Sequence, residues 1–304
     1  MSKRKPIGLF VSDLHLSSKR PSCRVDDWIR VQEDLLYRIS GIAAKYQVPI
    51  FACGDIFDKP KEDPVIEALA IRWMKKNKWY GIPGQHDLPG HSLSRIGESS
   101  FGVLMEAGVL QYVEGTGHVD DFLITGFPYG IHATCAVDSN KLKVAIAHEM
   151  VWRKQPFPGA PEKGNVKKLV KRYPGFDVLV FGDNHKGFST RVKGVSILNC
   201  GTALQRTVVE HDYFTQCFLL YSDGSHKSIP YILQSSWRTV DLDLAKREKA
   251  LDDRIRAFVK TIQGDKEVSL SFIDNLKEYL ESSEVSDSVK EVIWKAMEEV
   301  ESNG

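Results

Sequence analysis

Residues 49–58 read Pro-Ile-Phe-Ala-Cys-Gly-Asp-Ile-Phe-Asp, a short apolar run that ends in glycine and then presents two aspartates, Asp55 and Asp58. The run has the length and composition of a buried strand. Amphipathic helical patterns flank it over residues 25–46 and 64–77, and the second opens with proline. A buried strand between two helices predicts an α/β sandwich, whose functional loops lie at the carboxyl ends of the strands.

The same order, an apolar run followed by polar side chains, recurs along the chain. We predict further strands at 7–11, 79–82, 109–114, 122–127, 143–148, 177–181 and 195–198, a helix at 165–173 and a hairpin at 215–233. Four of these strands are followed by the polar groups Asp13-Leu14-His15, Gly84-Gln85-His86-Asp87, His148-Glu149 and Gly182-Asp183-Asn184-His185. Because five such groups would not share one rim by accident, we expect them to form a single site.

The residue types of these five groups are those of a metal centre. Two divalent cations about 3.5–4 Å apart can clamp the attacking and leaving oxygens of a phosphoryl displacement. Such a pair needs a bridging carboxylate and further nitrogen or oxygen ligands, and Asp and His supply them. The glycines beside them, Gly54, Gly84 and Gly182, allow sharp turns and the close approach of a phosphate.

The order D-x-H, G-D-x-x-D, G-Q-H-D, H and G-D-x-H over residues 7–200 resembles the order D-x-H, G-D-x-x-D, G-N-H-D, H and G-H-x-H of the calcineurin-like metallophosphoesterases. Within that superfamily, residues 54–58, 199–206 and 237–244 are similar to the SbcD-type nuclease subunit of double-strand-break repair, and residues 84–92 resemble its compact bacteriophage versions. The resemblance implies a four-layer α/β/β/α sandwich over 1–233, followed by a short, mainly helical extension over 234–304. It also implies a Mn²⁺-dependent DNA exonuclease or endonuclease of repair, recombination or replication.

The resemblance assigns a role to each polar group. It implies metal one at Asp13, His15, Asp55 and His185, and metal two at Asp55, Gln85, His148 and Asp183, so that Asp55 bridges them. His86 would face the scissile phosphate and protonate the leaving oxygen, while Asp58 would orient its neighbours. Asp87 and Glu149 are further candidates for a supporting role.

Two positions depart from the family pattern, and both fall on metal two. Gln85 stands where the family has Asn, and Asp183 stands where it has the first His of G-H-x-H. Both replacements keep an oxygen donor, so we expect a working site. The added carboxylate favours Mn²⁺, with Mg²⁺ as the other choice, over softer metals.

The substrate is predicted to be DNA. In Ser/Thr phosphatases of the superfamily an arginine follows the second aspartate of the G-D motif, whereas Lys59-Pro60 follow Asp58 here. Residues 1–233 hold 30 basic against 24 acidic side chains, which favours a polyanionic partner. The expected DNA contacts are Lys163, Lys167, Lys168, Lys171 and Arg172, with Trp152 stacking on bases.

Residues 234–304 hold 11 basic against 16 acidic side chains and predict helices at 245–263, 269–282 and 287–301. The resemblance implies an SbcC-type coiled-coil ATPase as partner, docked on the last two helices, and allows a homodimer. The segment is too short to hold the family's full DNA-capping domain in addition to these partner-binding helices, so the capping domain is expected to be reduced or absent. Five cysteines without a C-x-x-C pair, no apolar stretch of about 18 residues and no signal-like N-terminus predict a cytoplasmic protein with no membrane contact.

Two other functions remain open from the sequence. One is a phosphodiesterase of the same superfamily that acts on small or cyclic nucleotides and needs neither a basic surface nor a partner. The other is an inactive subunit that scaffolds the ATPase, which only Gln85 and Asp183 favour.

Overall fold

The computed structural model describes residues 4–154 and 161–231, together with the single positions 241, 243, 280 and 290. The chain divides into two compact units, Met1–Ala245 and Lys246–Gly304. The helices predicted at 245–263, 269–282 and 287–301 lie outside the described residues. No described helix has the length and apolar character needed to cross a membrane.

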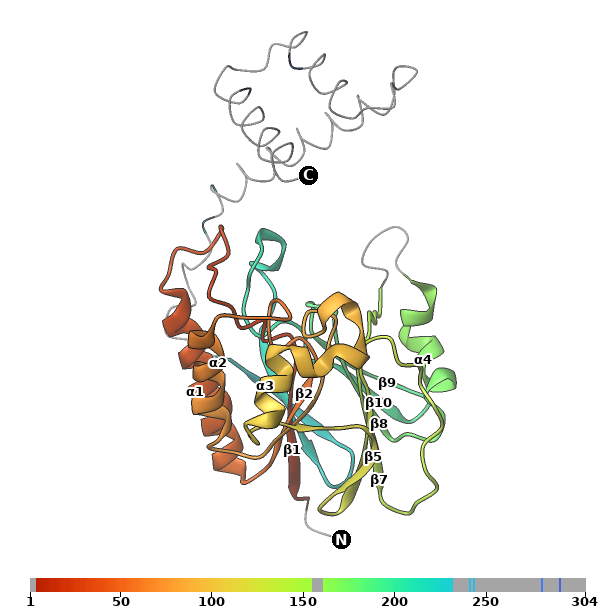
Figure 1. The fold of residues 1–304 in the computed structure, drawn as a ribbon. Helices are drawn as coiled ribbons and strands as arrows, with labels where there is room; N and C mark the ends of the chain where they lie inside the picture. The colour runs from red at the N-terminus through yellow and green to blue at the C-terminus, as the bar shows by residue number, and fades with distance from the viewer. Residues whose placement is uncertain are drawn as a thin grey trace. The chain divides into compact units, whose positions relative to one another are not determined.

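The first unit contains two six-stranded mixed sheets (Figure 1). The first sheet has the order β12-β11-β1-β2-β3-β4, with bounds β1 Pro6–Val11, β2 Ile50–Cys53, β3 Trp79–Ile82, β4 Gln111–Tyr112, β11 Gln216–Tyr221 and β12 His226–Pro230. The second has the order β5-β6-β7-β8-β10-β9, with bounds β5 Gly115–Val119, β6 Phe122–Phe127, β7 Leu142–His148, β8 Val178–Gly182, β9 Phe188–Val192 and β10 Val195–Asn199.

Helices cover the outer faces of the two sheets. The α-helices are α1 Trp28–Tyr46, α2 Pro64–Met74, α3 Ser100–Glu106 and α4 Val166–Arg172. Short 3₁₀ turns lie at Pro89–His91, Leu93–Glu98, Glu162–Gly164 and Val208–Glu210. Figure 1 shows α1, α2 and α3 on the side of the first sheet and α4 on the side of the second. This arrangement confirms the predicted α/β/β/α sandwich.

Alternating side chains of the strands form three core layers. In β8, Val178 and Val180 pack in the cluster between the two sheets, whereas Leu179 and Phe181 pack in the cluster under α4. In the first sheet, Phe10 faces the other sheet and Leu9 faces the helices. Since side chains alternate along a strand, a strand buried on both faces needs an unbroken apolar run. The apolar runs that the sequence predicts as β1 and β8 are such doubly buried strands.

Element ends differ from the predictions where local chemistry decides them. The helix predicted from residue 25 begins at Trp28, because the Asp27 side chain caps it by accepting from the Arg30 backbone N–H. The strand predicted at 109–114 is reduced to β4. Three described elements, α3, β5 and β9, were not predicted: α3 is only seven residues long, and β5 and β9 are edge strands with polar sequences.

Candidate metal centre

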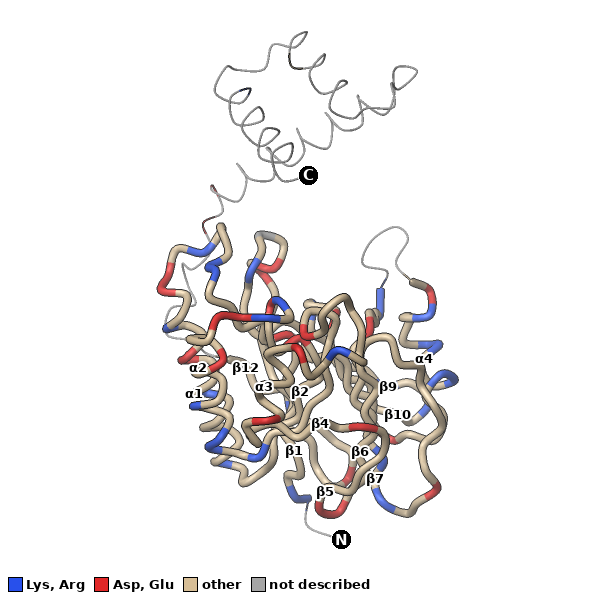
Figure 2. Tube along the Cα trace, viewed as in Figure 1, with Lys and Arg blue, Asp and Glu red and all other residues tan. Residues whose placement is uncertain are grey.

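The loops after β1, β2, β3, β7 and β8 converge at one end of the two sheets. The backbone N–H of His15 donates to the carbonyl of Asp55 at 3.0 Å, which ties the first two loops together. The backbone N–H of Asp183 donates to the Asp13 carboxylate at 3.2 Å, which joins the second sheet to the first. Figure 2 shows acidic residues gathered among these loops, above β2. All five polar groups of the sequence therefore meet here.

The backbone is strained where these side chains enter the site. Four non-glycine residues, Asp13, His15, Asp55 and Asp183, have φ angles of 50°, 45°, 52° and 81°. This left-handed region costs about 1–3 kcal/mol for such residues, and it persists where the surrounding structure enforces it. Two glycines are required for a different reason. A Cβ on Gly84 would lie 2.1 Å from Asp55 Oδ1, and one on Gly182 would lie 2.0 Å from Ser12 Oγ.

Asp13, His15 and His185 form the first group of converging ligand atoms. The two Nε2 atoms of His15 and His185 lie 3.1 Å apart. Asp13 Oδ1 lies 3.9 Å from His15 Nε2 and 3.7 Å from His185 Nε2. The ligand atoms of all three residues are within 4.8 Å of one another, a spacing that a single cation can satisfy.

Asp55 connects this group to a second one. Its Oδ2 lies 3.8 Å from His15 Nε2 and 3.3 Å from His148 Nε2, and Asp13, Asp55 and His148 also converge within 4.8 Å. Asp55 Oδ2, His148 Nε2 and Gln85 Oε1 are buried without a hydrogen-bond partner. Because buried polar atoms are almost always paired, three unpaired acceptor-type atoms in one place fit a set of metal ligands.

The two residues that depart from the family pattern, Gln85 and Asp183, contact each other. Gln85 Nε2 donates to Asp183 Oδ1 at 2.9 Å, which leaves Gln85 Oε1 directed elsewhere. Asp183 is half-buried and is not one of the residues whose ligand atoms converge within 4.8 Å. The structure therefore places Asp183 beside the metal ligands, with one carboxylate oxygen engaged by Gln85.

The other ring nitrogens of two histidines are held by acceptors. His148 Nδ1 donates to the Cys53 carbonyl at 2.7 Å, and His185 Nδ1 donates to Glu210 Oε1 at 2.5 Å. These bonds direct each Nε2 into the site and fix the tautomer that a metal needs. Sequence reasoning missed Glu210, because it lies in the short 3₁₀ turn Val208–Glu210, which follows no predicted strand end, and no local pattern marks it.

Comparison with known proteins gives the family. The profile of the calcineurin-like phosphoesterases matches residues 9–187, more than half of the chain. The chain belongs to this family. It is therefore a metal-dependent phosphoesterase of a family that uses divalent metal ions, and its described residues include candidate metal-binding clusters. A comparison with curated proteins gave no significant match.

Solved structures of similar fold include three with low sequence identity. They are an archaeal phosphodiesterase (12% identity, TM-score 0.42, 74% of this chain and 99% of the other), a candidate 5′-nucleotidase from Staphylococcus aureus (16%, 0.45, 81% and 58%), and the Thermus thermophilus sulfate thiohydrolase SoxB (12%, 0.46, 82% and 60%). The chain thus spans less than two thirds of the latter two.

In this family member, a ring nitrogen of His86 converges with ligand atoms of His15 and Asp55 within 4.8 Å, and Asp58 lies beside this group. The His86 backbone N–H donates to Asp55 Oδ1 at 3.0 Å, and its ring Nδ1 lies 2.7 Å from the Asp58 carbonyl. The ring centroid is 5.0 Å from that of His15. The Asp58 carboxylate pairs with the Arg206 guanidinium and lies 3.6 Å from His15 Nδ1. Arg206 is a second site residue that the sequence analysis did not single out.

Burial governs the protonation of the phosphoesterase site. It raises the pKa of Asp13 to about 6 and lowers the pKa of His15 to about 4, so that His15 is a neutral imidazole at pH 7. Burial also acts on Asp55, but His148 and His15 outweigh it and hold the Asp55 pKa below its usual range. A neutral imidazole and an ionised bridging carboxylate are the forms that bind metal. At His148 burial disfavours the charged ring, but the Asp55 and Asp13 carboxylates outweigh it and raise the His148 pKa well above its usual range, so a metal held there would displace a proton.

Asp87 and Glu149 have different roles. Asp87 is fully buried and accepts from the backbone N–H groups of Gly84, Phe57 and Ile56 at 2.9, 2.9 and 3.2 Å, so it braces the loops after β2 and β3. Glu149 instead accepts from both terminal nitrogens of Arg172 at 2.8 and 2.7 Å, outside the ligand groups.

The structure changes part of the predicted DNA surface. Lys163, Lys167 and Lys171 are exposed, and Lys168 is exposed but pairs with Glu162. Arg172 is engaged by Glu149, so it is not a free cation for phosphate. Trp152 is only 8% exposed, and its indole N–H donates to the Pro161 carbonyl. The expectation that Trp152 stacks on bases does not fit this placement, because the ring is buried.

Proposed function

We propose that this phosphoesterase is a Mn²⁺-dependent phosphodiesterase that cleaves DNA with two cations. The observation that carries the proposal is the set of converging ligand groups, in which Asp55 joins Asp13 and His148 in one group and His15 and His86 in another, with unpaired buried acceptor atoms on Asp55, His148 and Gln85. Asp13, His15, Asp55 and His185 would hold one cation, and Asp55, Gln85, His148 and Asp183 the other. When bound, such cations neutralise phosphoryl oxygens and make water nucleophilic at neutral pH.

The protein's own residues supply the remaining chemistry. Because His86 Nδ1 is anchored on the Asp58 carbonyl, its Nε2 edge remains for the substrate, where we assign it the proton that the leaving oxygen takes up. We assign Asp58, whose carboxylate pairs with Arg206 and lies 3.6 Å from His15 Nδ1, an electrostatic role in positioning His15. Glu210 acts in the same way through His185.

The charge around the site favours a diester over a monoester. A phosphomonoester dianion needs a free cationic group, but Arg206 is engaged by Asp58 and Arg172 by Glu149. Lys59 extends into solvent, with its ammonium 3.9 Å from Glu62. The exposed Lys167 and Lys171 on α4 provide a surface for the phosphates that flank a scissile diester in a polynucleotide.

The proposal includes an SbcC-type coiled-coil ATPase as partner, docked through residues 269–301, and allows a homodimer. Its support is the similarity of residues 54–58, 199–206 and 237–244 to the SbcD type. Co-purification of the full chain with such an ATPase would test it, and free elution of the two proteins would contradict it.

The test of the nuclease proposal is digestion of end-labelled linear duplex DNA by the full chain with Mn²⁺. We expect degradation that disappears in Asp55→Asn and persists in Asp121→Asn, a matched change at an exposed turn. Loss of cutting in both variants, or in neither, would contradict the assignment of Asp55.

A second candidate is a small-nucleotide phosphodiesterase, which a cavity of about 280 Å³ beside His148 favours. Turnover of small diesters with intact DNA would support it against the nuclease. Fewer than two equivalents of bound Mn²⁺, with no turnover of either substrate, would instead indicate the inactive scaffold.

A further inference from the structure

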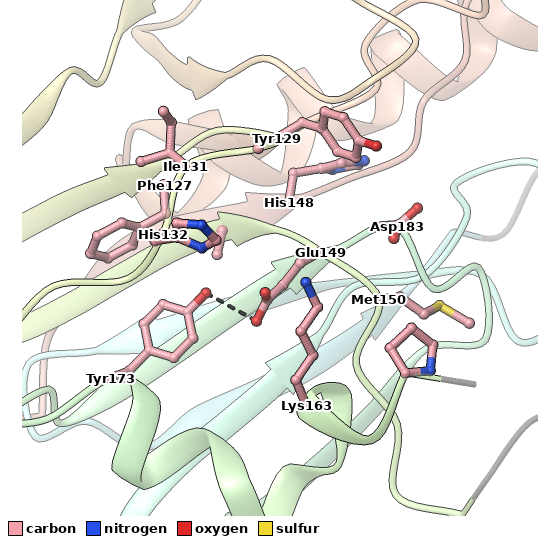
Figure 3. Close-up of a pocket in the computed structure, with 13 residues that line it drawn as sticks. Phe127, Tyr129, Ile131, His132, His148, Glu149, Met150, Lys163, Tyr173 and Asp183 are labelled. Carbon is pink, nitrogen blue, oxygen red and sulfur yellow. Dashed lines mark hydrogen bonds between the residues drawn. The ribbon is translucent and has the colours of Figure 1, made fainter. Parts of the chain in front are cut away.

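A cavity of about 280 Å³ adjoins the metal centre on the side of the second sheet (Figure 3). His148 and Asp183 belong both to the wall of this cavity and to the proposed second metal site. A group bound in the cavity would therefore be next to a phosphate held at that site. The volume is slightly below the roughly 300–1,000 Å³ of sites for drug-sized ligands, so it suits one compact ring system.

The walls provide flat and apolar surfaces. Phe127 is buried, whereas Tyr129 is half-buried and Ile131 is exposed. Both the backbone and the side chain of Tyr129 are held in place. Its backbone N–H donates to the Pro83 carbonyl at 3.1 Å, and its ring packs edge-to-face on the His91 ring with the centroids 5.9 Å apart. A fixed aromatic ring at a half-open cavity is a surface on which a planar ring can stack.

Two charged side chains give the cavity a polar edge, and Figure 3 shows them between Tyr173 and Asp183. Glu149 is fixed by Arg172 and by the Tyr173 hydroxyl, which donates to Oε1 at 3.1 Å. A carboxylate has about four acceptor positions, and these partners use three. Glu149 thus keeps an acceptor position and Lys163 brings a donor. This pairing complements the carbonyl and N–H edge of thymine or guanine.

We propose that this cavity binds the nucleobase of a nucleotide next to the scissile phosphate, with Tyr129 as the stacking surface and Glu149 and Lys163 at the base edge. The inference rests on the proposed function, because it takes the phosphate to lie at the metal centre. Tyr129 is thereby assigned a role in substrate specificity. The substrate is a diester that carries a nucleoside, and the base of this nucleoside lies in the cavity beside His148.

The first experiment compares two diesters with the same leaving group, thymidine 5′-(p-nitrophenyl phosphate) and methyl p-nitrophenyl phosphate. With the Mn²⁺-loaded full chain we expect kcat/KM at least tenfold higher for the thymidine diester. Tyr129→Ala should remove about tenfold from that value and less than twofold from the methyl diester, since base stacking has about this effect. Tyr37→Ala is the matched control, because Tyr37 is an exposed tyrosine packed edge-to-face on Trp73.

Equal values for the two diesters, or an equal loss on both in Tyr129→Ala, would overturn the base-binding proposal while leaving the phosphodiesterase in place. Hydrolysis of neither diester would count against the proposed function for small substrates. Calorimetry on the Mn²⁺-loaded protein would then decide the cavity. Thymidine 5′-monophosphate should bind at least tenfold more tightly than inorganic phosphate, and Tyr129→Ala should abolish the difference. Equal affinities would overturn the proposal.

Discussion

Replacing Glu210 with Gln should weaken one of the two proposed metal sites and spare the other. Glu210 Oε1 accepts from His185 Nδ1 at 2.5 Å, and Oε2 accepts from the backbone N–H groups of Arg206 and Thr207 at 2.6 and 3.0 Å. A glutamine has only one acceptor oxygen, so it cannot accept from His185 and from both backbone N–H groups as Glu210 does. Its amide nitrogen would face either His185 or the two backbone donors, and Glu210 is too buried for water to compensate.

The size of the effect follows from the bond that is lost. A hydrogen bond to a charged group contributes about 1.5–3 kcal/mol, which corresponds to about 10–150-fold in an equilibrium constant. Loss of partners that orient metal-bound histidines costs about 10–100-fold in metal affinity. We therefore expect one Mn²⁺ equivalent to bind about 10–100-fold more weakly in Glu210→Gln, and the second to keep its wild-type affinity.

Isothermal titration with Mn²⁺ measures both equivalents, and thermal melting reports whether the variant is folded. Glu98→Gln is the matched control, because Glu98 is an exposed glutamate paired only locally with Arg95. Unchanged Mn²⁺ binding in a folded Glu210→Gln protein would refute the reasoning. Equal weakening of both equivalents with a large fall in melting temperature would show a general structural role instead.

Four other predictions concern the site and the basic surface. Asp183→His should shift metal preference toward nitrogen-binding ions in competition titrations, and a metal profile like that of the wild type would show that Asp183 is not a ligand. His86→Ala should lower kcat by about 10²–10⁴-fold with Mn²⁺ stoichiometry unchanged, and lost metal would contradict its role. Lys167→Ala with Lys171→Ala should reduce the salt slope of DNA binding by about 0.9 per lost phosphate contact, whereas an unchanged slope would remove α4 from the DNA surface. Burial raises the pKa of Asp13 to about 6, so protons should compete with metal for this carboxylate below that pH. Mn²⁺ affinity should therefore fall between pH 7.5 and pH 5, and an affinity that does not change over this range would contradict a ligand role for Asp13.

The sandwich and the rim that carries the site follow from the pattern of apolar and polar residues along the chain. Strands buried on both faces require unbroken apolar runs such as residues 50–53 and 178–182, and polar residues that follow such runs lie at strand ends wherever the strands pack. This placement predicts that the aspartates and histidines after the strands meet at one rim. The structure confirms it for Asp13, His15, Asp55, His148 and His185.

The contacts that hold these ligands in place depend on tertiary packing. Glu210 reaches His185 from 25 positions away, and Arg206 reaches Asp58 from 148 positions away. No periodicity or spacing encodes such pairs, because they arise when distant loops are brought together by the packing of the two sheets. For the same reason Trp152, which the sequence made a candidate for stacking, is buried, while Tyr129, which no motif marked, lines the cavity beside the metal centre.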